Sequence, residues 1–190
     1  VYKGMNLGTG KITKKEMLSV PHHLLDVVSP KKIFTVNDFQ KLANKKIKEI
    51  SNKGKIPIIC GGTGFYIDAI VNGIIFPEVP PNKKLRAILE KKTTEELFET
   101  LKKLDSNRAR IIDKHNKVRL VRAIEIAKAL GKVPKFKVGP LGLLQGPTFI
   151  KIGLTMPKEI LMEKVRIRLF ARIRDGMLRE IKKLHDSGVS

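Results

Sequence analysis

Apolar positions follow a helical spacing in the first third of the chain. The spacing across residues 38–51 predicts an amphipathic helix, with Asn37 as its N-cap. Residues 56–60 form a short continuous apolar run, which is typical of a strand buried in a parallel sheet. A glycine-rich turn follows, and residues 65–72 are predicted to form a second helix. This order of helix, strand, turn and helix is typical of an α/β layer.

The pattern changes at Pro77, the first of three closely spaced prolines. From there to residue 130 the apolar spacing is helical, and no segment is a convincing strand. Thr93 and Glu96 have the spacing of a capping box, and Gly131 is predicted to end the last of these helices. Residues 133–147 are rich in glycine and proline and are predicted to form a loop or linker.

The last part of the chain returns to a mixed pattern. Residues 148–154 are predicted to form a strand, Pro157 suits the first turn of a helix that reaches Asp175, and another helix follows to His185. We therefore expect an α/β fold with an all-helical insertion. Its core comprises residues 1–76 and 148–190, and the insertion with its linker comprises residues 77–147.

The composition indicates a globular protein and excludes several kinds of site. Of the 190 residues, 42% are hydrophobic, which is enough to bury a core. The chain has no apolar run of about 18 residues and no signal-peptide pattern at residues 1–11, so we expect neither a membrane span nor a signal peptide. Cys60 is the only cysteine, which excludes an intrachain disulfide and a metal site built from cysteines. A reducing compartment fits best, and we expect the cytoplasm.

The net charge of +21 indicates a polyanionic partner, with nucleic acid or an anionic membrane surface as candidates. Solvated lysines in a chain from an AT-rich genome are an equally good account of the lysines. The arginines differ, because all of them lie at or after Arg86, in the ranges 86–122 and 166–179. Since arginine binds phosphate in a bidentate manner, this asymmetry indicates anion-binding surfaces in the second half of the chain.

The sharpest local motif is the turn GGTG at residues 61–64. Its glycines allow backbone N–H groups to approach a ligand, and the following helix N-terminus favours an anion. A tight turn from strand to helix with no ligand explains the same residues equally well. Residues 5–12 only superficially resemble a phosphate-binding P-loop, because Met5 and Ile12 occupy positions that require glycine and a hydroxyl residue.

Two arginine pairs have helical spacing. Arg119 and Arg122 share one helix face, and Arg168 and Arg172 share another. Such pairs more commonly form part of a solvated basic surface. The functional interpretation is that one pair contacts nucleic-acid phosphates and the other a diphosphate.

Taken together, these motifs resemble the tRNA dimethylallyltransferase family, in its order and approximate spacing. The resemblance spans nearly the whole chain, although residues 166–188 fit less tightly. The motifs are YKGMNLGT at residues 2–9, PHHLLD at 21–26, PIICGGTGFY at 57–66 and RLVRAIE at 119–125.

The resemblance implies a P-loop-NTPase-like parallel-sheet core and a helical insertion that grips the tRNA anticodon stem-loop. It also implies the reaction, in which the exocyclic amine of an adenosine beside the anticodon attacks dimethylallyl diphosphate. Mg²⁺ and cationic groups would stabilise the departing diphosphate. The adenosine would be turned out of its stack. We expect a monomer.

The resemblance also assigns residues. Thr63 corresponds to a threonine in the reaction channel, and Arg168 to a diphosphate-binding arginine, with Arg166 or Arg172 as alternatives if the register slips. Both are the expected catalytic residues. The expected substrate-binding residues are Gly61, Gly62, Gly64 and Tyr66, and the expected tRNA-binding residues are Arg86, Arg119 and Arg122.

The family's P-loop, its general-base aspartate and the ligands of Mg²⁺ are expected to precede Val1, and its last helices to follow Ser190. We therefore expect these 190 residues alone to be catalytically inactive. Two alternatives stay open: a non-catalytic basic RNA-binding module, and a fragment of another P-loop enzyme such as a small-molecule kinase. The scarcity of base-stacking aromatics weakens the first, and the basic helical insertion weakens the second.

Overall fold

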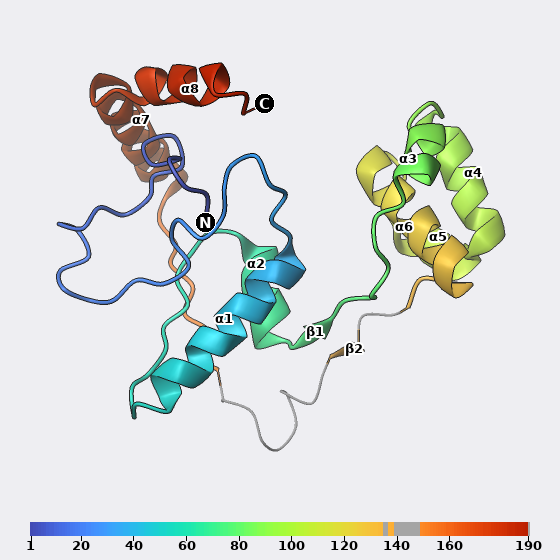
Figure 1. The fold of residues 1–190 in the computed structure, drawn as a ribbon, viewed down its shortest axis with the longest axis horizontal. Coiled ribbons are helices and arrows are strands. Elements are labelled where there is room, and N and C mark those ends of the chain that lie inside the picture. Colours follow the sequence, from blue (N-terminus) through green and yellow to red (C-terminus); the bar gives the residue numbers. More distant parts are fainter. Residues whose placement is uncertain (135–136, 139–148, 190) are drawn as a thin grey trace. The chain divides into compact units, whose positions relative to one another are not determined.

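The structure, a computed structural model, describes residues 1–134, 137–138 and 149–189 (Figure 1). The chain divides into two compact units. The first unit combines Val1–Val71 with Gly146–Ser190, and the second is Asn72–Gln145. The second unit starts before the predicted boundary at Pro77 because Ile74 and Ile75 pair with residues 137–138.

The described part of the first unit contains four helices: α1 (Val36–Ser51), α2 (Gly64–Val71), α7 (Lys158–Arg174) and α8 (Met177–Asp186). The predicted N-cap of α1, Asn37, is wrong. The cap is Thr35, whose hydroxyl accepts from the Asp38 N–H while the Asp38 carboxylate accepts from the Thr35 N–H. This capping box satisfies two backbone donors at once, which Asn37, already inside the helix, is unable to do.

A small core joins α1 to α2. Ala43 and Ile47 on α1 and Ile70 on α2 are buried, and partly buried apolar side chains pack around them. The Phe39 and Tyr66 rings stack with their centroids 4.6 Å apart, and the Gln40 side chain donates to the Ala69 carbonyl at 2.5 Å. The surrounding side chains are Leu24, Phe39, Ile59 and Phe149.

The two predicted core strands do not form a sheet in the described structure. Residues 56–60 lie outside any strand and alternate in burial, with Ile56 and Ile58 86% exposed and Ile59 packed against the core. Residues 149–154 also lie outside any strand, and Thr148, the first residue of the predicted strand, lies outside the described residues. A strand requires a hydrogen-bonded neighbour, and no described segment provides one. The only described parallel pairing is an isolated bridge between Tyr2 and Val28, so the P-loop-like sheet is not confirmed.

The described part of the second unit contains four helices: α3 (Lys83–Leu89), α4 (Thr94–Leu104), α5 (Ser106–Ile111) and α6 (Lys117–Leu130). The capping box of Thr93 and Glu96 is confirmed, and Gly131 ends α6 in the left-handed conformation with φ 78°. One prediction was wrong here. Within the predicted linker, β2 (Lys137–Val138) pairs antiparallel with β1 (Ile74–Ile75), because two connections that run in opposite directions satisfy each other's backbone groups.

The core of the second unit lies between α4 and α6. Leu97 and Leu101 on α4 and Leu120 and Ile124 on α6 are fully buried. By contrast, α7 in the first unit has no buried residue. No helix in the described ranges has the length and apolar character needed to cross a bilayer.

Because Leu101 is fully buried, we expect Leu101→Ala to lower the free energy of unfolding of the second unit by about 3 kcal/mol. The matched control is Leu104→Ala on the same helix, where the side chain is 37% exposed and the expected loss is below about 1 kcal/mol. Native-state hydrogen exchange of the α4 and α6 amides in urea measures both. Equal losses would show that the α4–α6 interface is not the core.

Candidate functional site

The glycine turn lies at the start of α2 and is open to solvent. The Thr63 carbonyl accepts from the N–H groups of Tyr66 and Ile67, so Thr63 stands at the N-cap position. Its hydroxyl has no hydrogen-bond partner among the described residues. A Cβ added at Gly61, Gly62 or Gly64 would meet nothing within 4 Å. The turn therefore has room for a ligand beside a helix N-terminus, where an anion is stabilised.

Tyr66 has a packing role next to this turn. Its ring stacks on Phe39, and its hydroxyl donates to the Phe34 carbonyl at 3.3 Å. The Phe34 N–H in turn donates to the Tyr2 hydroxyl at 3.3 Å, so one backbone unit bridges the two tyrosines. Burial raises the pKa of Tyr66, which stays neutral. These contacts fix the direction of the first turn of α2, and a role for Tyr66 in substrate binding stays a prediction.

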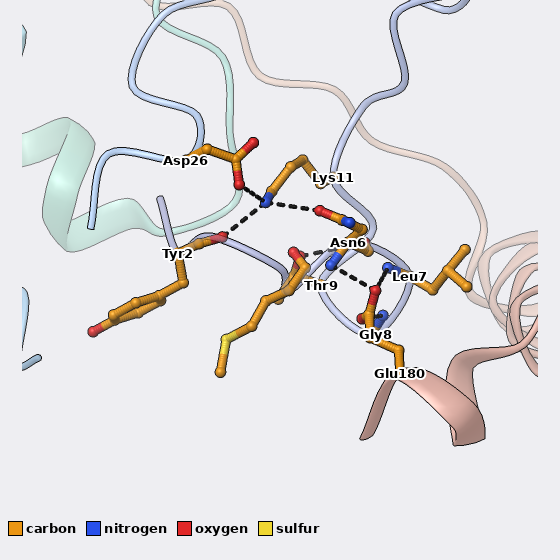
Figure 2. Close-up of polar contacts among 9 residues, drawn as sticks. Tyr2, Asn6, Leu7, Gly8, Thr9, Lys11, Asp26 and Glu180 are labelled. Carbon is orange, nitrogen blue, oxygen red and sulfur yellow. Dashed lines mark hydrogen bonds and ion pairs between the residues drawn. The ribbon is translucent and has the colours of Figure 1, made fainter. Parts of the chain in front are cut away.

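A loop near the N-terminus binds a carboxylate through its backbone. The N–H groups of Asn6 and Leu7 donate to Oε2 of Glu180, and that of Gly8 donates to Oε1, each at 3.0 Å (Figure 2). Burial raises the pKa of Glu180, but these three backbone hydrogen bonds outweigh it and hold the pKa below its ordinary value. We call this arrangement of Asn6, Leu7, Gly8 and Glu180 the carboxylate clasp.

The base of the same loop is fixed by Lys11. Its Nζ donates to the Tyr2 carbonyl at 2.7 Å and to Oδ1 of Asn6 at 2.9 Å, and it pairs with Oδ1 of Asp26 at 2.6 Å (Figure 2). Only 8% of the Lys11 side chain is exposed. The hydrogen bond from Lys11 lowers the pKa of the Asp26 carboxyl. Lys11 is thus a structural cation that fixes the loop conformation.

The arginines of α7 differ in how they are held. Arg166 makes two hydrogen bonds of 2.9 Å with the carboxylate of Glu163 on the same helix. Arg172 lies against Gly10, so closely that a Cβ on that glycine would overlap its guanidinium. Arg168 is exposed and has neither a hydrogen bond nor an ion pair to any described residue. Arg172 likewise has no hydrogen bond or ion pair to a described residue, but it is half-buried, so Arg168 is the more accessible of the two to an anion.

In the second unit, Glu125 brings two predicted tRNA-binding residues together. Arg86 on α3 donates to Oε1 at 3.0 Å and to Oε2 at 2.8 Å, and Arg122 on α6 pairs with Oε2. The Glu125 carboxylate also accepts from the Asn82 N–H, and Arg122 donates to the Val79 carbonyl at 2.8 Å. Arg86 and Arg122 thus form a network around the buried Glu125 that connects α3 and the preceding segment to α6.

This network strongly shifts the pKa of the Glu125 carboxyl. The Glu125 side chain is 1% exposed, and burial raises the pKa of its carboxyl. The hydrogen bonds from Arg86, the Asn82 N–H and Arg122 outweigh burial and lower the pKa from 4.5 to about 2. The two arginines stay about one-third exposed, so part of each guanidinium faces solvent. Arg119, by contrast, is exposed, and its side chain is unpaired among the described residues.

Sequence reasoning missed the two carboxylates that organise these sites. For Glu125 a signal existed, because it is the one acidic residue of the helix and lies three positions after Arg122, on the same face. For Glu180 no local signal existed, since its partners lie 172 to 174 residues away. Of the predicted site residues, the structure brings together those of the glycine turn, and it brings Arg86 and Arg122 together on the carboxylate of Glu125. No hydrogen bond or ion pair between described residues joins Arg168 to the turn.

The sequence matches the IPP transferase family over residues 1–190. It is 39% identical over 191 residues to the tRNA dimethylallyltransferase of Anoxybacillus flavithermus, covering 100% of this chain and 61% of the relative. The structure of a tRNA isopentenylpyrophosphate transferase from Bacillus halodurans is similar, with a TM-score of 0.64 and 34% identity, covering 100% of this chain and 59% of that one. A eukaryotic dimethylallyltransferase acting on tRNA shares the fold, with a TM-score of 0.73 at 24% identity over 98% of this chain and 47% of that one. The chain spans less than two thirds of the length of these relatives.

The Glu125 network yields a prediction for stability. Glu125→Gln leaves two arginines without their buried counter-charge, so we expect the free energy of unfolding of the second unit to fall by about 3 kcal/mol at pH 7. Because the folded-state pKa is depressed, this stabilisation is complete above about pH 4.5 and is lost as the pH falls through about 2. Denaturant unfolding of the wild-type chain and the variant between pH 2 and 7 measures the effect.

The matched control is Glu99→Gln on α4, an exposed residue whose Lys102 partner is 3.9 Å away. We expect its stability to equal that of the wild-type chain, because exposed ion pairs contribute little. If Glu125→Gln has the same free energy of unfolding as this control at neutral pH, the network does not stabilise the second unit.

Proposed function

Because the chain belongs to the IPP transferase family, we propose that a protein carrying these residues is a tRNA dimethylallyltransferase. It transfers a dimethylallyl group from dimethylallyl diphosphate to the exocyclic amine of an adenosine beside the tRNA anticodon. The observation that carries this proposal is the family match over all 190 residues, together with relatives of 39% and 37% identity that are named for this activity.

The glycine turn is proposed to line the reaction channel. Its open surroundings, the free Thr63 hydroxyl and the start of α2 all favour an anionic or hydroxyl-bearing ligand. Negative charge grows on the diphosphate as the allylic C–O bond breaks. Fixed N–H donors and a hydroxyl act most strongly on such developing charge. The turn therefore supports the diphosphate and orients the nucleotide.

Arg168 is proposed as the arginine that binds the diphosphate. It is unpaired among the described residues, whereas Arg166 is neutralised by Glu163 and Arg172 lies against Gly10. A guanidinium with free donors binds two phosphate oxygens at once and remains charged throughout the reaction. It stabilises the leaving group without accepting or donating a proton.

The second unit is proposed to bind the anticodon stem-loop. Arg119 offers a free guanidinium, while Arg86 and Arg122 present the solvent-facing parts of groups that Glu125 already orients. The net charge of +21 of the whole chain adds a long-range attraction for polyanions. We propose a monomer in the cytoplasm, without membrane association.

Mg²⁺ is proposed to neutralise charge on the diphosphate in the assembled active site. Within the described ranges, no group of three or more His, Cys, Asp or Glu side chains could hold a metal ion. We therefore assign none of its ligands to this chain and route no step of the reaction through it.

The test is prenyl transfer from labelled dimethylallyl diphosphate into unmodified tRNA. It is run on the chain alone and on the chain completed with a family N-terminal segment and C-terminal tail. We expect activity only in the completed protein, and a loss of about 100-fold in Arg168→Ala, since removal of a charge-stabilising donor typically costs this much. Arg166→Ala is the matched control on the same helix and should retain activity.

A loss in Arg166→Ala or Arg172→Ala instead of Arg168→Ala would move the diphosphate role to that residue. If the completed protein binds tRNA but transfers nothing, the RNA-binding module becomes the better account.

The contribution of the second unit is tested by tRNA binding at several salt concentrations. We expect Arg119→Ala to weaken binding and to reduce the slope of log K against log salt by about one, as for the loss of one phosphate contact. Lys102→Ala on α4, a lysine already paired with Glu99, is the control and should change the slope less. An unchanged slope in Arg119→Ala would remove that residue from the interface.

A further inference from the structure

We infer that Glu180 is a positioning residue for the diphosphate-binding arginine face of α7, acting through the carboxylate clasp. The inference rests on the proposed function, because it concerns how Arg168 is presented to a diphosphate. Three features within the first unit support this role. The clasp binds α8 to the loop, Arg172 of α7 lies against the same loop, and Arg168 lies one helical turn from Arg172.

The clasp requires a carboxylate. Oε2 of Glu180 accepts from two N–H groups and Oε1 from a third, so both oxygens act as acceptors (Figure 2). Glutamine has the same shape but replaces one oxygen with an NH₂ group, which would face a backbone N–H, donor against donor. Either orientation of the amide breaks at least one of the three hydrogen bonds. Glu180→Gln thus removes the clasp with little change in volume.

The loop also seats Arg172. Lys11 and the clasp fix the loop from Asn6 to Lys11, and Gly10 within it adopts φ 63°. The Arg172 guanidinium occupies the space where a side chain on Gly10 would be. Glycine suits this position for two reasons: a Cβ is disfavoured at this positive φ, and it would push the end of the Arg172 side chain aside.

These contacts fix α7 and α8 against one loop. Glu180 connects the loop to α8, and Arg172 connects it to α7. Helix α8 follows α7 after the turn at Gly176. Because Arg168 and Arg172 share a face four residues apart, seating Arg172 also sets the direction in which Arg168 points. No residue of α7 is buried, so the helix has little other packing to fix its rotation. The clasp therefore pre-organises the arginine face and lowers the ordering cost of binding.

The experiment is a titration of the 190-residue chain with inorganic pyrophosphate, followed by NMR, which detects weak binding. We expect wild-type binding to be abolished by Arg168→Ala and weakened at least fivefold by Glu180→Gln. In Glu180→Gln the amide proton signals of Asn6, Leu7 and Gly8 should also move upfield, which reports the loss of the clasp itself. Glu159→Gln, which removes an exposed carboxylate from the first turn of α7 and leaves the Glu163–Arg166 pair intact, should leave affinity and these signals unchanged.

Gly10→Ala provides an independent variant. It displaces Arg172 but keeps all three N–H donors of the clasp, so we expect weakened pyrophosphate binding with the three amide signals retained. If Glu180→Gln loses the clasp signals but binds pyrophosphate as tightly as the wild-type chain, the positioning role is overturned while the proposed diphosphate site stands. If the wild-type chain binds no pyrophosphate, or Arg168→Ala binds it equally well, the proposed diphosphate site fails, and the inference fails with it.

Discussion

The attachment of α8 to the N-terminal loop of the first unit depends on three backbone N–H groups that converge on one carboxylate. Loop backbone donors need partners, and a loop without a regular ladder has few of them. Here Glu180 satisfies the N–H groups of Asn6, Leu7 and Gly8 at once, and in doing so joins segments 172 to 174 residues apart. Since α7 has no buried side chain, hydrophobic packing contributes little to its position. The close approach of Arg172 to Gly10 and the hydrogen bonds of the following helix α8 to the loop are its described contacts.

In the second unit a buried carboxylate also gathers several donors, but two of its partners are arginine side chains. Glu125 is buried and accepts from two arginines and a backbone N–H, so the carboxylate neutralises cations that otherwise repel each other. In the second unit a single acid orients basic side chains whose remaining donors face solvent, and in the first unit we propose that Glu180 does so indirectly, through the loop. A protein that binds anions with many cations needs such internal counter-charges, because uncompensated positive charge destabilises the folded chain.

Local features were largely predictable, and long-range features were not. The capping box at Thr93 and the cap at Gly131 follow from a few adjacent residues, as does the separation of a helical unit from the rest. The N-cap of α1 was misplaced because Thr35 and Asn37 are both good caps, and only the position of Asp38 decides between them. The strand at residues 56–60 was predicted from its apolar run, yet a strand exists only with its neighbour. The candidate site residues of the glycine turn came from a motif, whereas Glu180 acts across the whole chain.

The division of the first unit has a consequence for biosynthesis. Its two segments flank the second unit in sequence, so the ribosome delivers the second unit complete before the last part of the first. The α4–α6 core is built from nearby residues and is able to form as soon as it emerges, since local contacts close quickly. The Asn6–Gly8 loop, although made early, waits for Glu180 before its backbone donors are satisfied. Until then those three backbone donors are left to water.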